Sequence, residues 1–395
     1  MHSILRKHDK GPLALILMCA LMWGILHMIT GISAAGPSAY NSYTLQALSW
    51  LQGRLDVDNR VYLELAVYGE RYYVSFPPLP SVVLLPFALV FGAATPDNLL
   101  VKLYSLAAVI LIYKAVRHLG FGQAAAVAWA FLFTFGSSLL PLTLEGAVWY
   151  HAQVLAFMLT VLALYLITED RPVPAIICYA LSVACRPFNA LYGIVIAAVY
   201  MSVSVKAGES AGRVLKKVRF GILSGLAVAA AIGIFNYIRF ADPLEFGHSY
   251  LPEFSTQGGT QFSLSHIGGN IRSFILRLPF RYEDGSVVIE KFGFSAFIAC
   301  PALTLIVIWI VRDLIKKTFS VEKAVIAAVF VLHFTLLLMH RTFGGFQYGA
   351  RYCVDLMPYA LFYRLCDLRK PSRTEFVLPG LGFALAFAGT ILIHL

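Results

Sequence analysis

The sequence predicts an all-α polytopic membrane protein with about 11 transmembrane helices, because its composition is too apolar for a water-soluble fold. Of its 395 residues, 59% are hydrophobic and only 13% are charged, and the mean hydropathy is +0.75. A soluble globular chain carries about 45–50% apolar and about 25% charged residues. So few charges cannot cover a surface that faces water, which excludes a soluble enzyme, a disordered regulator and a coiled coil.

Eleven apolar segments are candidates for transmembrane helices, each of which needs about 20 mostly apolar residues to cross the hydrocarbon core. They lie at residues 12–32, 99–116, 124–142, 152–168, 172–186, 188–205, 220–238, 292–311, 323–340, 354–366 and 375–393. A further apolar stretch, Leu79–Phe91, has only 13 residues and contains Pro80 and Pro86. We expect this stretch to enter the outer leaflet and return, or to lie along it.

Basic residues orient the predicted helices, because cytoplasmic loops carry an excess of Lys and Arg. Basic stretches precede the first span and fill three later loops, at residues 6–10, 206–219, 312–323 and 364–373. An even number of crossings must separate the amino terminus from residue 206, which agrees with six spans and leaves out the stretch at 79–91. The first apolar segment is longer than the 7–15-residue core of a signal peptide, so we expect an uncleaved anchor. The amino terminus is then cytoplasmic and the carboxyl terminus outside.

This topology makes residues 1–395 a single integral membrane domain of a cell membrane, with two long loops on the outer face. The first loop covers 33–78 and leads into the re-entrant segment, which ends at about residue 92, and the second loop covers 239–291. Shorter outer segments lie at 145–153 and 340–355, and every inner connection is short. Since binding and catalytic residues concentrate on loops that a rigid scaffold positions, we expect the active site on the outer face.

The net charge of +10 has different meanings on the two sides of the membrane. Inside, the mixed Lys and Arg account for orientation, so no nucleic acid partner is predicted. Outside, ten of the twelve basic residues are arginine. Guanidinium groups bind phosphate bidentately and are less strongly hydrated than ammonium groups. A phosphate-bearing ligand is one explanation, and salt bridges with headgroup contacts are the other.

The first outer loop offers an interfacial helix, a turn and several acids. Apolar residues between positions 43 and 51 suit an amphipathic helix at the interface. Gly69-Glu70, bounded by alternating Tyr and Val, indicates a short hairpin or turn, and Arg71, which follows it, is a candidate for substrate binding. Asp56 and Glu64 are among four acids of this loop, and a carboxylate there could deprotonate an acceptor as a general base. On spacing alone, a solvated loop acid is the favoured explanation for each of them.

Two further clusters are candidates for the walls of a binding pocket. Glu145 lies at the outer end of the third span, with Trp149, His151 and Gln153 just after it, although an interfacial aromatic belt has the same pattern. The second cluster consists of Arg186, which ends the fifth span before Pro187, and the segment 344–355 with Gln347, Tyr348 and Arg351. A charge between apolar spans needs an anionic partner, and Asp355, four residues after Arg351, could supply one. We favour a binding site here over a purely structural role.

The second outer loop contains a predicted interfacial helix at 267–278, in which Ile271, Phe274, Ile275 and Leu278 recur at helical spacing. Arg272 and Arg277 can project from it toward headgroups, either to recruit an anionic lipid or to anchor the loop.

Motifs of other function classes are missing from the sequence. It has no P-loop, no dinucleotide-binding G-x-G-x-x-G and no H-E-x-x-H, and its six cysteines form no C-x-x-C pair. No metal ligand set and no cofactor are predicted from these residues, and a divalent cation stays open.

Several segments resemble a known family. They are LSWLQGRL at 48–55, GERYYVSFPPLP at 69–80, NYIRF at 236–240, PLEFG at 243–247, and YGARY at 348–352, the last followed by Asp355 and Pro358. Together with one span that leads into a large outer loop, they resemble the GT-C superfamily of integral membrane glycosyltransferases, which includes aminoarabinose transferases of lipid A and protein O-mannosyltransferases. The local segments are closest to an uncharacterised bacterial branch.

The resemblance implies a hexosyl- or pentosyltransferase that moves a sugar from a polyprenyl-phosphate donor to a lipid, glycan or protein acceptor at the outer face of a bacterial plasma membrane. It implies Glu64 as the base, with Asp56 next and Glu145 as a second polar contributor. The same resemblance implies that basic side chains hold the lipid phosphate, and a single displacement would invert the anomeric centre. Many relatives have an Asp-Glu pair shortly after the first span, where this chain has Tyr40-Asn41, so a paralogue without activity stays open.

The main alternative function is a lipid-linked sugar flippase or secondary transporter. Such proteins commonly show related halves and charged residues near mid-membrane, whereas this chain shows no internal repeat and places its polar candidates at the outer ends of spans. A non-catalytic scaffold or a polysaccharide polymerase subunit is the third alternative.

Overall fold

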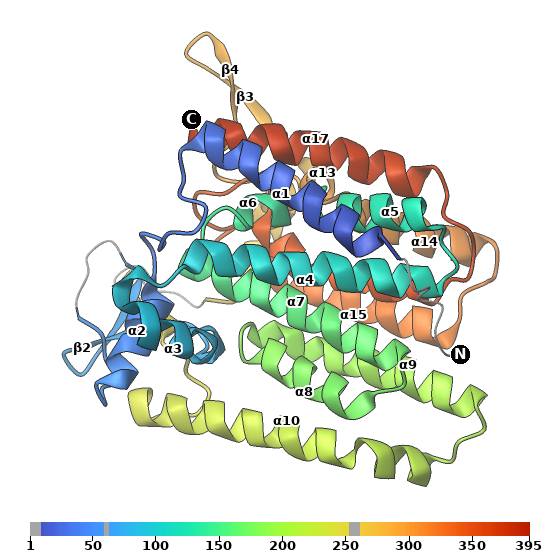
Figure 1. Ribbon diagram of the computed structural model, residues 1–395, viewed down its shortest axis with the longest axis horizontal. Helices are drawn as coiled ribbons and strands as arrows, with labels where there is room; N and C mark the ends of the chain where they lie inside the picture. Colours follow the sequence, from blue (N-terminus) through green and yellow to red (C-terminus); the bar gives the residue numbers. More distant parts are fainter. Residues whose placement is uncertain (1–8, 59–62, 253–260) are drawn as a thin grey trace.

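The computed structural model describes residues 9–58, 63–252 and 261–395, and most of its regular structure is helical. The long helices run side by side along one axis (Figure 1). Seven of the described helical segments are long and apolar enough to cross a membrane: α1 (Gly11–Thr30), α4 (Asp97–His118), α7 (Val148–Thr168), η2 with α9 (Pro187–Lys206), α10 (Ala211–Phe240), α15 (Val321–Leu338) and α17 (Thr374–His394). The all-α polytopic fold class is confirmed.

The four other predicted spans contain shorter helices. These are α5 (Gln123–Phe135), α8 (Pro172–Val183), α14 (Pro301–Ile315) and α16 (Met357–Leu365). The span predicted at 124–142 ends early, because the chain bends at Gly136 and only the short α6 (Leu139–Leu142) follows. A Cβ on Gly136 would lie 2.2 Å from the carbonyl oxygen of Pro379 in α17, so close packing of two backbones requires the glycine. Eleven crossings therefore stay a prediction.

The loops separate to the two ends of the bundle as the topology requires. The short connections at 119–122, 169–171, 207–210, 316–320 and 366–373 meet at one end, where α1 also begins, and the long loops and the carboxyl terminus lie at the other end (Figure 1). At the first end, Asp313 of α14 is buried and accepts hydrogen bonds from Lys323 of α15 at 2.7 Å and from Tyr363 of α16 at 3.0 Å. This shared carboxylate fastens three helices together.

The centre of the bundle is α7, which packs against α4 on one side and α8 on the other. Beyond α8 lies α10, which has few contacts with the rest of the protein. Only 6% of its most apolar segment is buried inside the structure, against 78% for the corresponding segment of α7. A 30-residue helix so exposed and so apolar has only lipid as a suitable environment. It begins with Ser210, whose hydroxyl accepts from the N–H of Arg213, and ends at Ala241 in a left-handed conformation.

The end with the long loops carries short elements that build the site. The first loop forms α2 (Ser42–Leu51), a hairpin of β1 (Leu65–Tyr68) and β2 (Arg71–Val74), and then α3 (Leu79–Phe91) with η1 (Gly92–Ala94). Gly69 and Glu70 both have positive φ, as the predicted two-residue hairpin turn requires, so the hairpin is confirmed. The predicted helix of the first loop is present as α2, and the re-entrant course of α3 stays a prediction.

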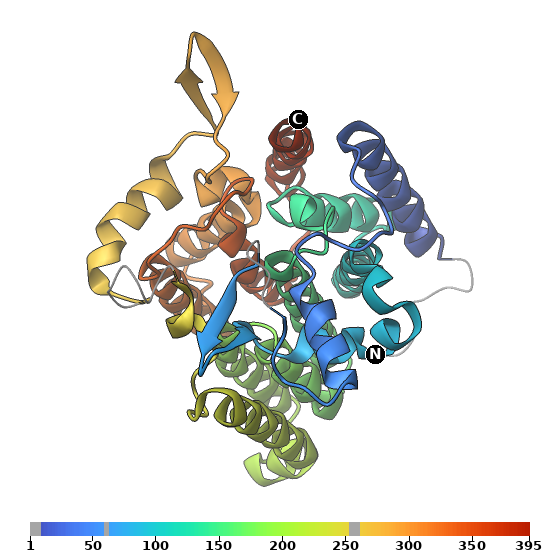
Figure 2. The ribbon, with the colours of Figure 1, turned by 90° about the vertical axis from the view of Figure 1, so that its left-hand side faces the viewer.

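The second loop forms η3 (His248–Tyr250), η4 (Leu264–His266), α12 (Ile267–Ile271), η5 (Arg272–Leu276) and a second hairpin of β3 (Phe280–Glu283) and β4 (Ser286–Ile289). Viewed toward this end, the second hairpin projects sideways from the bundle, while the first hairpin lies over its centre (Figure 2). The chain then passes through α13 (Ala296–Ala299) into α14, and a 3-10 helix, η6 (Arg351–Leu356), leads into α16.

Candidate functional site

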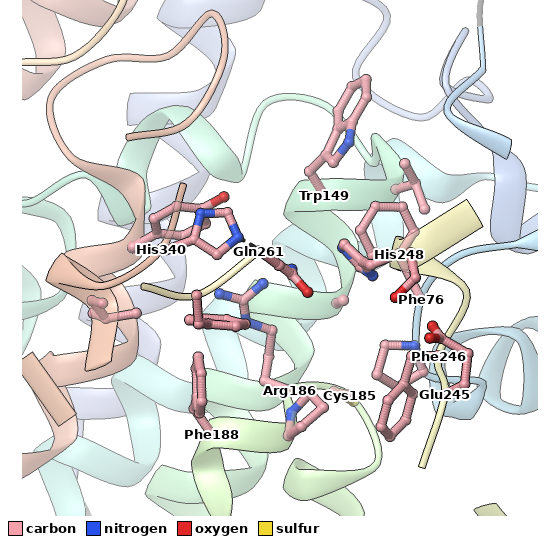
Figure 3. A pocket seen from close by; sticks show the side chains of 18 of the residues that line it. Phe76, Trp149, Cys185, Arg186, Phe188, Glu245, Phe246, His248, Gln261 and His340 are labelled. Atoms are coloured by element: carbon pink, nitrogen blue, oxygen red, sulfur yellow. Dashed lines mark hydrogen bonds between the residues drawn. The ribbon is translucent and has the colours of Figure 1, made fainter. Parts of the chain in front are cut away.

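A cavity of about 420 Å³ opens where the two long loops meet the ends of α7 and α8. Its walls come from the β2–α3 connection, the first turns of α7, residues 185–188, the turn at 244–249, and residues of the segments around His340 and Arg351. Arg186 and Gln261 reach toward its middle, with His340 on one side and His248 and Glu245 on the other (Figure 3). Segments separated by up to 276 positions, from Phe76 to Tyr352, thus line one space.

Arg186 is held in place by the carboxylate of Asp355. Its Nε donates to Asp355 Oδ2 at 3.1 Å, and the side chain of Asp355 is only 4% exposed. Gln153 donates to the other carboxylate oxygen at 2.9 Å, and the Tyr192 hydroxyl donates to the Asp355 backbone carbonyl at 2.6 Å. The pairing of Arg351 with Asp355 expected from their spacing is wrong. The segment forms a 3-10 helix with three residues per turn, so positions four apart do not share a face.

Arg351 lines the cavity without a carboxylate partner in the part of the chain that the structure describes. Its guanidinium lies 5.2 Å from the ring centre of Tyr352 and 5.9 Å from that of Tyr150, and its Nε is buried without a hydrogen-bond acceptor. An arginine held between aromatic rings keeps its charge and its donors for another group. The arrangement suits an anionic ligand.

Gln347 and Tyr348 were both predicted to bind substrate. In the structure they instead support the chain segment that carries Arg351. Gln347 is buried, accepts from the N–H of Arg351 at 3.0 Å and donates to the carbonyl of Phe343 at 3.0 Å. Tyr348 is buried with its ring edge against Phe294. Neither residue lines the cavity.

Two histidines that the sequence did not single out lie in the cavity wall. Burial, with smaller contributions from the charges of His340 and Arg186, lowers the pKa of His248 to about 4. Burial is also the largest cause that lowers the pKa of His340. The Nε2 atom of His340 lies 3.2 Å from the Nε2 atom of Gln261. Both rings are therefore neutral near pH 7, and the positive charge of the cavity comes from the two arginines.

The three predicted catalytic acids lie outside the lining of the cavity. Glu64 is exposed and accepts a hydrogen bond from Trp149 Nε1 at 2.6 Å, and this indole itself lines the cavity. Glu145 accepts from the Ser38 hydroxyl at 2.7 Å. Asp56 is half-buried. The residue after it, Val57, forms a β-bridge with Tyr72 of the first hairpin. Glu64 is thus one side chain away from the cavity, through Trp149.

The other predicted binding residues also lie elsewhere. His151 is buried in α7 against the rings of Tyr43 and Tyr104, and neither ring nitrogen has a hydrogen-bond partner. Three arginines are exposed on the loops, away from the cavity lining: Arg71 on β2, and Arg272 and Arg277 on and after η5. Of all the predicted site residues, the structure brings only Arg186 and Arg351 to the cavity.

Glu245 is the one acid among the described residues that line the cavity. Sequence reasoning did not select it, although it lies in the PLEFG segment that carried part of the family resemblance. A carboxylate in a short turn directly after a predicted span was the available signal.

An apolar groove adjoins the cavity along α10. Its walls are small and aliphatic residues of α10 with Val183 and Pro243, and it shares Leu244 and Phe246 with the cavity. Its volume is about 640 Å³. Two spaces with common wall residues, one charged and one apolar, suit a ligand with a phosphate head and a hydrocarbon tail.

A divalent cation finds no suitable ligand set among the described residues. No three His, Cys, Asp or Glu side chains are grouped there as a metal ion would require, so we derive no step through a metal.

Comparisons with known proteins find relatives by structure alone. No family model and no curated protein matches the chain. Among solved structures it is similar to the apo oligosaccharyltransferase of Archaeoglobus fulgidus, with 15% identity and a TM-score of 0.46 over 98% of this chain and 57% of that one. It is also similar to the arabinosyltransferase EmbB of Mycobacterium smegmatis, with 14% identity and a TM-score of 0.39 over 100% of this chain and 42% of that one.

The chain is thus similar to an oligosaccharyltransferase and an arabinosyltransferase, in both cases with a TM-score below 0.5. It spans a little more than half the length of the oligosaccharyltransferase, which has also been solved with an inhibitory peptide and a dolichol-phosphate. At these identities the likeness concerns the fold and assigns no residue a role.

Proposed function

We propose that the chain is a membrane glycosyltransferase that moves a sugar from a polyprenyl-phosphate donor to an acceptor at the outer face of the membrane. The observation that carries the proposal is the pair of adjoining spaces. The cavity offers an arginine that pairs with no carboxylate among the described residues, and the apolar groove along α10 shares the wall residues Leu244 and Phe246 with the cavity. A lipid tail in the groove would bring its phosphate to Arg351.

The charge of the cavity favours a monophosphate donor. Asp355 balances the charge of Arg186, and the two histidines are neutral, so among the described lining residues Arg351 is the one cation that no carboxylate pairs, and Glu245 adds one negative charge to the lining. A polyprenyl-phosphate sugar is a phosphodiester with one negative charge. When the sugar leaves, the phosphate gains a second charge, and the nearby guanidinium groups stabilise it in the transition state. A direct displacement inverts the anomeric centre, and a product with retained configuration in nuclear magnetic resonance would contradict it.

Reconstitution tests the proposal. Purified protein in vesicles receives a polyprenyl phosphate with a radiolabelled hexose or pentose, together with a membrane extract as the source of acceptor. We expect labelled product whose rate falls about ten- to a hundredfold in Arg351→Ala, since a hydrogen bond to a charged group contributes about 1.5–3 kcal/mol. Arg54→Ala is the matched control, because Arg54 is half-buried, pairs with Asp58 at 3.1 Å and does not line the cavity.

Two outcomes would refute the proposal. Passage of the labelled lipid across the bilayer without a new glycosidic bond would identify a flippase. Equal rates in wild type and Arg351→Ala would show that the cavity does not hold the donor phosphate.

A further inference from the structure

We propose that Glu245, in the second outer loop, is the general base that deprotonates the acceptor, in place of an acid of the first loop. This inference rests on the proposed function. Transfer to a hydroxyl or amine requires a proton acceptor within hydrogen-bond reach of the attacking atom, so the base must share the space in which the sugar reacts. Glu245 is the carboxylate that meets this condition among the described residues lining the cavity.

The carboxylate of Glu245 has room for a second partner. Its Oε1 accepts a hydrogen bond from the backbone N–H of Gly247 at 2.5 Å. No ion pair with this carboxylate and no hydrogen bond to its Oε2 is found within the described residues. Glu64, by contrast, is committed to Trp149, and Glu145 to Ser38. Glu245 is thus bound on one oxygen, which fixes its direction, and open on the other.

The turn that carries Glu245 is rigid. Asn236 in the last turn of α10 donates to the carbonyl of Pro243 at 3.2 Å, and Asp242 accepts from the N–H of Leu244 at 2.8 Å. Gly247 has a φ of +101°, and a Cβ there would lie 2.7 Å from the ring of Phe240, so a glycine is required at this position. A base that acts by position needs such a fixed backbone.

Arg239 ties this turn to the first outer loop. Its side chain is 2% exposed and donates to the carbonyl of Val74 in β2 at 2.8 Å and to Asn236 at 2.9 Å. Its guanidinium lies 4.0 Å from the ring centre of Phe235. A buried arginine that bonds a carbonyl on another loop joins the two loops into one unit. Arg239 is therefore a positioning residue for Glu245.

The reaction balances with the residues present. The acceptor O–H gives its proton to Oε2 of Glu245, and the freed electron pair forms the new bond to the anomeric carbon. The bond from that carbon to the phosphate oxygen breaks, and its electron pair leaves with the lipid phosphate next to Arg351. The proton later passes from Glu245 to water.

The test compares two nucleophiles in Glu245→Gln, which keeps the size and hydrogen-bond acceptor of the side chain. A hydroxyl acceptor in the membrane extract must lose a proton, whereas azide carries none. We expect transfer to the hydroxyl acceptor to fall about 10²- to 10⁴-fold, the usual contribution of a general base. Formation of glycosyl azide from the same donor should stay within about threefold of the wild type. Asp242→Asn in the same turn is the matched control, because asparagine keeps an oxygen for the N–H of Leu244.

The outcomes separate this inference from the proposed function. Equal loss of hydroxyl and azide transfer in Glu245→Gln would indicate a structural role and overturn the inference. Full hydroxyl transfer in Glu245→Gln, with loss in Glu64→Gln, would return the base to the first loop and leave the glycosyltransferase intact. A wild-type protein without transfer to either nucleophile would overturn both.

Discussion

Loss of the Arg186 side chain should destabilise the fold much more than loss of Arg351, although both line the same cavity. Arg186→Met removes the cation from Asp355, whose side chain is 4% exposed. Removing one partner of a buried ion pair costs about 3–5 kcal/mol, because a charge is left in a poorly solvating interior. The hydrogen bond from Gln153 remains, so we expect the lower end, about 3 kcal/mol.

The other arginine of the cavity, Arg351, provides the control. Arg351→Met breaks no ion pair among the described residues and should change the free energy of unfolding by less than about 1 kcal/mol. In the double variant Arg186→Met/Asp355→Asn the carboxylate charge is gone as well. We expect it to recover at least about 1.5 kcal/mol relative to Arg186→Met, which is the coupling that a double-mutant cycle measures for residues in contact.

Buried thiols report the unfolding. Cys300 and Cys353 are fully buried and do not line the cavity, so they react with a maleimide dye only when the bundle opens as the fraction of SDS in mixed micelles increases. Equal destabilisation by Arg186→Met and Arg351→Met would refute the reasoning. So would a double variant no more stable than Arg186→Met, because Asp355 would then not be the group that requires the cation.

Three more outcomes follow from the geometry. Ala230→Phe, which narrows the apolar groove, should raise the KM for a polyprenyl donor and leave a short-chain donor unchanged, with lipid-facing Leu226→Phe as the control; an equal effect on both donors would exclude the groove as the lipid site. Burial lowers the pKa of His248 from 6.5 to about 4, so the unfolded state binds a proton on this histidine at a higher pH than the folded state does. The free energy of unfolding should therefore fall as the pH drops from about 6.5 to about 4. His248→Gln should reduce this dependence on pH, and an unchanged dependence would contradict the prediction. A cysteine at Asp284 should react with an impermeant maleimide on intact cells and one at Lys317 only after lysis, since the two lie at opposite ends of the bundle; the reverse pattern would invert the orientation.

Local pattern sufficed for most of the fold. Each predicted span contains a helix, because a stretch of about 20 apolar residues has few alternatives to a membrane helix. The hairpin at Gly69-Glu70 could be predicted as well, since its turn needs two residues with positive φ. The bend at Gly136 could not, because the backbone that packs closely against this glycine is that of Pro379, 243 positions further along the chain.

The candidate site was harder to predict, because it too depends on contacts between residues that lie far apart in the sequence. Arg186 and Arg351 stand out in any reading, because a charge at the end of an apolar span is costly and needs an explanation. The partner of Asp355 depends on where α8 ends beside η6, and spacing along the chain pointed to the wrong arginine.

Glu245 shows why an acid in a loop is difficult to judge from its own surroundings. In the sequence it is one of many acids outside the spans, and its place in a short turn directly after a predicted span is a weak signal. What distinguishes it is the anchoring of its turn by Arg239 to Val74, 165 positions earlier, and the shared cavity with Arg186 and Arg351. A base and a phosphate-binding cation must face the same reacting bond from opposite sides. Loops that are far apart in the chain can meet that condition only when the bundle brings their ends together, so the choice between Glu64 and Glu245 depends on tertiary structure.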